Sequence, residues 1–161
     1  MLLLFMIVTT SGFLVTGEYL TRNRFEAKAT DIVQNDPTLG DIPRYFGKDR
    51  FVVATLGGRE IIGCCGLQIE GQVGTVRHWH VKYPYRNRGL GWDLLELVIE
   101  KGKAEKKNPL ERIECNTYNL QKRAEKTLKD HGFGRIGGGV KEPGFLGLYG
   151  IQTRTWIKEL K

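Results

Sequence analysis

The sequence lacks the cysteine pattern of a disulfide-rich or zinc-binding protein. Its 161 residues include three cysteines, Cys64, Cys65 and Cys115. The number is odd and two of them are adjacent, so they match neither a disulfide framework nor the spacing of zinc ligands. We therefore expect a reducing compartment. Because all three fall in expected strands, we expect each to be a small buried hydrophobic residue.

Acidic residues are in the minority. The chain has 18 Asp and Glu against 25 Lys and Arg, which gives a net charge of +7 and a sequence pI near 9.4. Such an excess suits nucleic acid, an acidic membrane surface or a polyanionic small ligand. The sequence has no motif of interleaved aromatic and basic residues, which argues against nucleic acid as the partner. At 18.3 kDa the chain has the length of one domain with a substantial core.

The first 17 residues have no charge at all. As a helix this apolar segment, 1–17, would span roughly 25 Å at ~1.5 Å per residue, slightly short of the ~30 Å hydrocarbon core of a bilayer. It has neither the basic start nor the cleavage site of a secretory signal. A helix is expected at 18–34, where Arg22, Arg24 and Lys28 favour the cytosolic side of a membrane. We therefore expect two parts, the segment 1–17 and a domain at 18–161. The alternative is that the segment is part of a longer hairpin, because Met1 lies inside the apolar run.

The remaining sequence predicts strands and helices in the order β-β-β-α-β-α-β-β. Helical periodicity predicts helices at 92–107 and 121–131, and a loop or short helix at 41–46. Gly137-Gly138-Gly139 is expected to interrupt the C-terminal strands. Apolar alternation predicts strands at 51–56, 61–69, 74–81 and 112–117, and one or two more within 145–157.

A loop rich in glycine and arginine separates the third strand from the first long helix. Gly89 and Gly91 leave the backbone N–H groups accessible, so an anion can approach these amides and the positive end of the following helix. Arg86 and Arg88 add positive charge at the rim. The Rossmann fingerprint needs a third glycine where Leu94 stands, and the Gly-Lys-Ser/Thr of a P-loop is missing. Neither standard nucleotide motif fits this loop.

The pattern Arg86-x-x-Gly89-x-Gly91 resembles the Arg/Gln-x-x-Gly-x-Gly/Ala signature of the GCN5-related N-acetyltransferase (GNAT) superfamily. The preceding strand ends in Val81, as the acetyl-CoA strand of this family usually does. Downstream, Ala124 and Gly132-Phe133 match the family's Asn-x-x-Ala-x-x-x-Tyr-x-x-x-Gly-Phe. The resemblance covers roughly residues 51–156. It implies an α+β fold in layers, with a mixed, mostly antiparallel sheet and helices on both faces. The residues that it implies for cofactor binding are Val81, Arg86, Asn87, Arg88, Gly89, Leu90 and Gly91.

The same resemblance implies an enzyme that uses acetyl-CoA as donor. The acetyl group would pass directly to a primary amine of a protein or small molecule in a ternary complex, with a backbone N–H near Val81 holding the oxyanion. The region before the first strand usually lines the acceptor site in this family. Tyr45 and Phe46 are therefore candidates for substrate binding, although core packing explains Phe46 better. No metal is expected, because no ligand cluster stands near His78-x-His80.

The residues that move the proton are less well defined by the sequence. His78 and His80 are two apart on the third strand and therefore on one face, where either could act as general base. They could equally be structural histidines. The family's usual acid tyrosine is replaced by Leu128. Another hydroxyl such as Tyr118 or Tyr149 can replace it, or coenzyme A leaves as a thiolate. The alternative is a non-catalytic acetyl-CoA-binding module.

The apolar segment 1–17 adds a finer resemblance. Some acetyltransferases of the superfamily, the membrane-anchored type that includes cysteine-conjugate N-acetyltransferase, have an apolar segment directly before the domain, and this chain looks similar. The resemblance implies membrane association through 1–17, with the domain in the cytosol. A soluble cytoplasmic protein is the alternative.

Overall fold

The computed structural model describes residues 36–106, 108–142, 147 and 150–160. It divides the chain into two compact units, Met1–Asp41 and Ile42–Lys161. In the first unit the described residues form the short helix α2 (Pro37–Gly40), which Asp36 caps by accepting a hydrogen bond from the backbone N–H of Thr38 at 2.9 Å. The expected segment 1–17 and the expected helix at 18–34 lie outside the described residues. Among residues 36–106, 108–142, 147 and 150–160, which the structure describes, no helix is long and apolar enough to cross a membrane.

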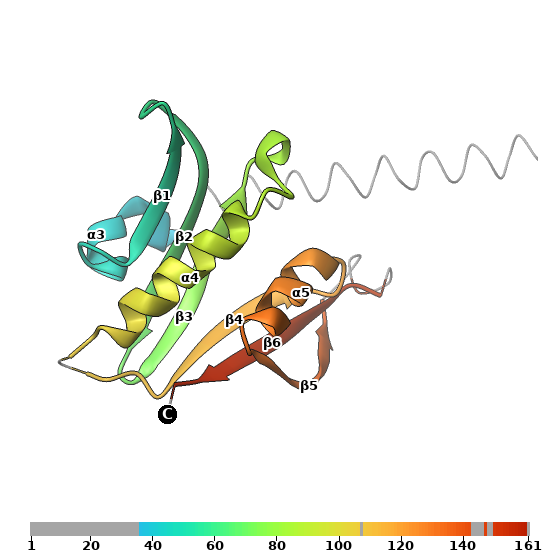
Figure 1. Cartoon of the computed structure of the whole chain (residues 1–161). Helices are drawn as coiled ribbons and strands as arrows, with labels where there is room; N and C mark the ends of the chain where they lie inside the picture. The colour runs from blue at the N-terminus through green and yellow to red at the C-terminus, as the bar shows by residue number, and fades with distance from the viewer. Residues whose placement is uncertain (1–35, 107, 143–146, 148–149, 161) are drawn as a thin grey trace, which may run out of the picture. The chain divides into compact units, whose positions relative to one another are not determined.

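The second unit has strands and helices in the predicted order, shown in Figure 1, although one C-terminal strand, at 134–141, lies before the predicted range of 145–157. Its strands are β1 (Phe51–Leu56), β2 (Glu60–Glu70), β3 (Val73–Val81), β4 (Arg112–Tyr118), β5 (Gly134–Lys141) and β6 (Gln152–Glu159). Its helices are α3 (Ile42–Phe46), the 3-10 turn η1 (Tyr83–Tyr85), α4 (Leu90–Lys103) and α5 (Lys122–Asp130).

The six strands form one mixed sheet with the order β1-β2-β3-β4-β6-β5. Strands β1, β2 and β3 form an antiparallel meander, and its first turn contains Gly57 and Gly58, both with positive φ. The only parallel pair in the described sheet is β3 with β4. A parallel pair requires a crossover, and α4 provides it. The predicted mixed, mostly antiparallel sheet is thus confirmed.

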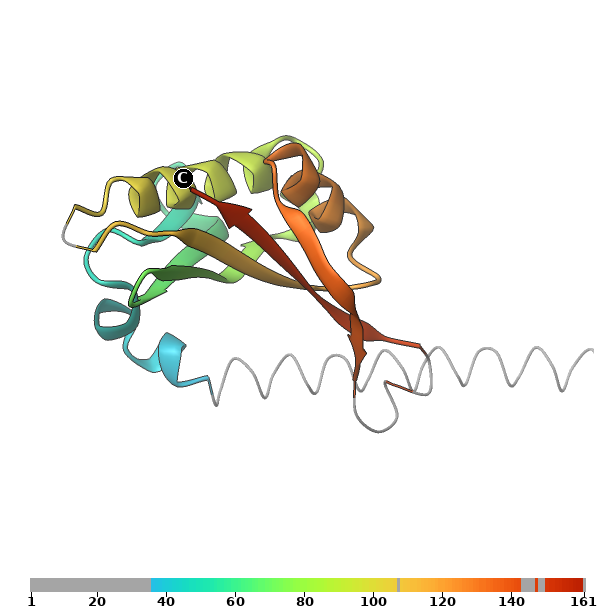
Figure 2. The ribbon, with the colours of Figure 1, turned by 90° about the horizontal axis from the view of Figure 1, so that it is seen from below.

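Helices cover both faces of the sheet (Figure 2). A Cβ at Gly63 would lie 3.0 Å from Leu94 of α4, whereas a Cβ at Gly66 would lie 2.6 Å from Phe46 of α3. These two β2 positions therefore face opposite sides of the sheet. We call them the α4 face, which α5 also covers, and the α3 face.

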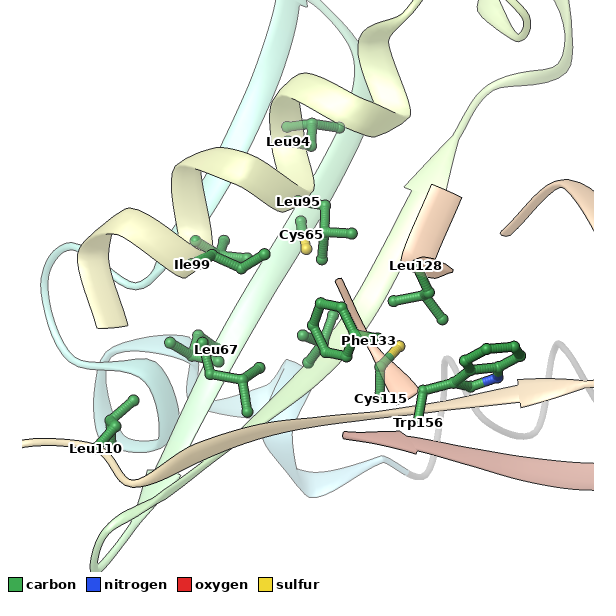
Figure 3. Close-up of a cluster of buried hydrophobic side chains, with 13 residues drawn as sticks. Cys65, Leu67, Leu94, Leu95, Ile99, Leu110, Cys115, Leu128, Phe133 and Trp156 are labelled. Atoms are coloured by element: carbon green, nitrogen blue, oxygen red, sulfur yellow. The ribbon is translucent and has the colours of Figure 1, made fainter. Parts of the chain in front are cut away.

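The main hydrophobic core lies on the α4 face (Figure 3). The predicted apolar side of α4 is buried there through Leu94, Leu95, Val98 and Ile99. Gly102 lets α4 approach the sheet closely, since a Cβ there would lie 2.7 Å from Leu67. Contributions from the C-terminal half of the chain are Ile113, Cys115, Leu128, Phe133 and Trp156.

The glycine run near the C-terminus disturbs a strand without ending it. Gly137, Gly138 and Gly139 lie inside β5, where the pairing with β6 shifts between Ile136 and Val140. The predicted interruption is therefore a local irregularity in an edge strand. The predicted strand region at 145–157 is observed as β6, which begins later and extends further.

Candidate functional site

The segment of residues 86–91, here called the anion loop, connects η1 to the first turn of α4. Gly89 is the N-cap of α4 with φ +85, and Asn87 also has a positive φ of 65. A Cβ at Gly89 would meet nothing within 4 Å, so no side chain covers the backbone there. The backbone N–H groups of Trp92 and Asp93 both donate to the carbonyl of Gly89. The N–H groups before them have no carbonyl within the helix, which leaves donors for an anion at the positive helix end.

Two side chains attach the anion loop to the end of β3. The Nε of Arg86 donates to the carbonyl of Val81 at 2.7 Å. The indole Nε1 of Trp79 donates to the carbonyl of Gly91 at 2.9 Å. The Arg86 side chain thus anchors the loop as well as adding charge. The anchoring role of Trp79 was not predicted, because a tryptophan in a strand usually indicates a core residue and the sequence does not show its contact with Gly91.

Beyond the anion loop, β3 and β4 stop pairing before either strand ends. Their register runs from Val73 with Arg112 to Val76 with Cys115. Strand β3 then continues to Val81, and β4 continues to Tyr118 along β6. The two strands diverge toward their C-terminal ends in Figure 1. Over this stretch the facing backbone groups have no ladder partner across the gap, so they can bind an extended ligand that carries amides.

An irregularity in β3 lies beside this divergence. The register of β2 with β3 passes from Gly66 opposite Arg77 to Cys64 opposite His80, which gives β3 one extra residue. His78 takes up the extra length with φ +51, a value uncommon for a residue with a side chain. The sequence gives no signal for this bulge, because it depends on the pairing with β2.

The two candidate base residues share the α3 face but differ in surroundings. The His78 ring is half-buried against Phe46, with centroids 5.9 Å apart, and against Phe51 at 6.4 Å. His80 pairs with Cys64, whose neighbour Gly63 points to the α4 face, so alternation places His80 on the α3 face. His80 is exposed at its surface. Partial burial of the ring and, second, the positive charge of Arg86 lower the pKa of His80.

Tyr118 lies across the divergence from the histidines. Its neighbour Thr117 is buried on the α4 face, where its hydroxyl accepts a hydrogen bond from Nε1 of Trp156 at 2.9 Å. Alternation along β4 therefore places the half-buried Tyr118 on the α3 face. Leu128 has no exposed surface and belongs to the core, so the usual acid position carries no hydroxyl. Tyr149 lies outside the described residues.

The two candidate acceptor-binding residues of α3 have different environments. Phe46 has no exposed surface, and a centroid distance of 5.1 Å places its ring against Phe51. This burial agrees with the core-packing role that the sequence favoured for Phe46 over contact with the acceptor, because its ring packs against β2 and His78. Tyr45 is half-buried, with the Arg44 guanidinium 5.8 Å from its ring. Tyr45 remains a candidate.

The cysteines are buried or half-buried thiols, as predicted, and all three are free. Burial raises the pKa of Cys115 to about 12, and burial also raises the pKa values of Cys64 and Cys65. All three are therefore protonated at neutral pH and poor nucleophiles. In the described part of the chain no group of His, Cys, Asp and Glu is arranged to hold a metal ion.

Three contacts of α5 were not predicted from the sequence. Nη1 of Arg123 donates to Oδ1 of Asn87 in the anion loop. His131, just after α5, stacks on Trp92 of α4 with ring centroids 3.7 Å apart. Glu125 is buried and pairs with Arg154 of β6 at 2.7 Å. Each contact joins residues 29 or more positions apart, where a single sequence gives no pairing signal.

Comparison with known proteins agrees with this architecture. The model of the acetyltransferase (GNAT) family matches residues 21–133, more than half of the chain. No curated protein sequence matches the chain significantly.

Several solved structures share the fold. A GNAT-family acetyltransferase from Staphylococcus aureus has 21% sequence identity and a TM-score of 0.62, over 81% of this chain and 88% of that one. A putative streptothricin acetyltransferase from Bacillus anthracis in complex with acetyl-CoA has 21% identity and a TM-score of 0.58, over 73% and 67%. A GNAT-family acetyltransferase from Elizabethkingia anophelis with acetyl-CoA bound has 20% identity and a TM-score of 0.56, over 80% and 88%. With its anion loop beside two diverging strands and a family match over most of its length, this chain belongs to the GNAT family of acetyltransferases.

Proposed function

We propose that the protein transfers an acetyl group from acetyl-CoA to a primary amine by direct transfer in a ternary complex. The observation that carries this proposal is the position of the anion loop, at the start of α4 and beside the divergence of β3 and β4. Acetyl-CoA has phosphates at one end and an extended amide-bearing arm that ends in the thioester. An anion site next to two unpaired strand edges suits both parts.

In this proposal the backbone of the anion loop holds the pyrophosphate and the strand edges hold the arm. The N–H groups around Gly89 and Gly91 supply donors without a side chain in the way. A backbone N–H near Val81 would stabilise the oxyanion that forms on the acetyl carbonyl. Two structures that share this fold contain acetyl-CoA, which supports acetyl-CoA as the donor.

The acceptor needs a base only if its amine is strongly basic. An amine with a pKa of ~10.4 is neutral in about one molecule in 2,500 at pH 7, which costs near 4.6 kcal/mol, whereas an α-amine near 7.8 loses only about 1 kcal/mol. We assign the base to His80, because its lowered pKa keeps the ring neutral and able to accept a proton at pH 7. His78 is the second candidate, although its contacts with Phe46 and Phe51 suit a supporting role.

The leaving thiolate can take its proton from Tyr118 or leave unprotonated. Tyr118 is on the same sheet face as His80, at the end of the neighbouring diverging strand. Its phenolic O–H is a hydrogen-bond donor that could pass a proton to the leaving sulfur. The thiolate of coenzyme A is an adequate leaving group at neutral pH even without a general acid.

A non-catalytic acetyl-CoA-binding module is the second candidate function. It is favoured by Leu128, which fills the usual acid position with a buried apolar side chain. Calorimetry with acetyl-CoA combined with a thiol-release assay over a panel of amines separates the two functions. Donor binding with amine-dependent thiol release supports the enzyme. Donor binding without release from any amine supports the module, and absence of donor binding refutes both.

We also propose that the segment 1–17, which lies outside the described residues, attaches the protein to a membrane. The uncharged composition of the segment and the basic residues that follow it support this. Flotation of the full chain and of a chain without 1–17 on liposomes tests the proposal. The full chain should float and the shortened one should remain at the bottom. Equal behaviour of the two would rule out the anchor and support the soluble alternative.

A further inference from the structure

Arg123 brings a positive charge to the anion loop from the other side of the strand divergence. It lies in the first turn of α5, which follows β4, whereas the anion loop follows β3. Its Nη1 donates to Oδ1 of Asn87. Both side chains are exposed. The contact thus joins the segments after the two strands, beyond the last pair that holds the strands together.

The charge of Arg123 is not neutralised by a neighbouring carboxylate in the described part of the chain. The neighbouring lysines of the same helix do have carboxylate partners. Lys122 lies 3.7 Å from Glu125, and Lys126 lies 2.6 Å from Asp130. The partner of Arg123 is instead a neutral amide, which uses one of the five N–H donors of the guanidinium. An exposed hydrogen bond to a neutral group adds little stability and requires ordering a long side chain.

We propose that Arg123 binds a phosphate group of acetyl-CoA and determines the preference for the phosphorylated donor. This inference rests on the proposed function. A guanidinium binds phosphate through two parallel N–H groups, which Lys and amide side chains cannot do. Asn87 holds the guanidinium at the loop before the donor arrives. The Nε of Arg86 is already engaged with Val81, so the guanidinium of Arg123 adds N–H groups to those that Arg88 and the rest of the Arg86 side chain can offer.

The test compares Arg123→Met with Lys126→Met, which removes one positive charge one turn further along the same exposed helix. Affinities for acetyl-CoA, 3′-dephospho-acetyl-CoA and S-acetylpantetheine are measured by calorimetry on the full chain. Arg123→Met should weaken acetyl-CoA binding by about tenfold or more, as expected for hydrogen bonds to a charged group. Lys126→Met should change it by less than about twofold. Binding of S-acetylpantetheine, which has no phosphate, should not change.

The three donors also identify the phosphate. A loss in Arg123→Met that disappears with the 3′-dephospho donor assigns the 3′-phosphate. A loss that persists with that donor but disappears with S-acetylpantetheine assigns the pyrophosphate. Either result supports the proposal.

Other outcomes overturn it. Unchanged acetyl-CoA affinity in Arg123→Met, or an equal loss for S-acetylpantetheine, would show that Arg123 does not bind phosphate. Asn87→Gly keeps the left-handed backbone but removes the amide. If Asn87→Gly and Arg123→Met weaken all three donors equally, Arg123 acts only by holding the loop. Should the wild-type protein not bind acetyl-CoA, the proposed function itself fails, whereas normal wild-type binding with an unaffected Arg123→Met variant refutes only this inference.

Discussion

Gly89 offers the sharpest test of the anion loop, because its substitution separates backbone conformation from charge. The backbone has φ +85, and a Cβ at this position would meet nothing within 4 Å. Gly89→Ala therefore pays only for the left-handed conformation, about 1–2 kcal/mol. Gly89→Glu costs the same amount and also brings a carboxylate beside the proposed position of the donor phosphates. Two unit charges 4 Å apart repel by about 1 kcal/mol in water and about 4 kcal/mol near a protein surface.

The assay is calorimetric titration with acetyl-CoA at two salt concentrations, combined with urea unfolding. Gly89→Ala and Gly89→Glu should be destabilised equally, and Gly89→Glu should bind acetyl-CoA at least about fivefold more weakly than Gly89→Ala. This difference should shrink at high salt because the charges are exposed. Gly71→Glu is the matched control, since Gly71 also has a positive φ, +61, and nothing within 4 Å of a Cβ, but lies in the turn between β2 and β3, outside the anion loop. Equal affinity of the two Gly89 variants for acetyl-CoA would refute the placement of the phosphates at this loop.

Three further predictions address the surroundings of the site. Trp79→Phe removes the hydrogen bond to Gly91 and should lower the free energy of unfolding by about 0.5–1.5 kcal/mol in urea, with weaker donor binding by calorimetry. Gly102→Ala gains about 1 kcal/mol in helix propensity. It also places a Cβ 2.7 Å from the fully buried Leu67, and such overpacking destabilises the fold by about 1–3 kcal/mol. Its unfolding free energy should fall or stay level, and a clear rise would contradict the close packing of α4. The pKa of His80 is lowered, so its ring is neutral above pH 6.5. If His80 is the base, kcat/KM should therefore rise with pH at a midpoint below 6.5. His80→Ala should remove this limb and lower kcat by ~10²–10⁴ for a strongly basic amine, and a wild-type profile in the variant would exclude His80 as base.

The same shift predicts how stability depends on pH. With a folded pKa below the unfolded value of 6.5, His80 binds fewer protons when folded. Its contribution to the free energy of unfolding is therefore complete above pH 6.5 and is lost as the pH falls through the folded pKa. The titration of the His80 ring, followed by NMR, should have its midpoint below 6.5. A midpoint at or above 6.5 would contradict this.

The sequence predicted what depends on local patterns. The apolar side of α4, the hairpin at Gly57-Gly58 and the order of strands and helices along the chain all follow from periodicity and turn residues within short windows. The start of α4 was predicted two residues late, because Gly89 begins the helix from a left-handed conformation that periodicity does not reveal. The anion loop could be predicted because Gly89 and Gly91 form a local sequence signal, which indicates accessible backbone N–H groups.

The features that the sequence did not predict depend on segments far apart in the chain. The bulge at His78 follows from the register with β2. The burial of Glu125 was not predicted, because most residues of α5 are polar and its partner Arg154 lies far away in the sequence, in β6. The sequence favoured core packing for Phe46 but did not show its partner Gly66, which leaves room for the ring on the α3 face.

The buried thiols bear on the order of the chemical steps. A covalent route would need a nucleophile to carry the acetyl group, and a thiolate is the most reactive candidate in this chain. Burial raises the pKa of Cys115, the cysteine on β4 beside the divergence, to about 12, so it is almost entirely protonated at pH 7. Cys64 lies closer to His80, but burial also raises its pKa and its Sγ–H donates to the carbonyl of His78 at 3.2 Å. No described cysteine is therefore prepared to attack a thioester, which favours direct attack by the acceptor amine. In that case donor and acceptor must be bound together, and the rate should saturate with both substrates in intersecting rather than parallel double-reciprocal plots.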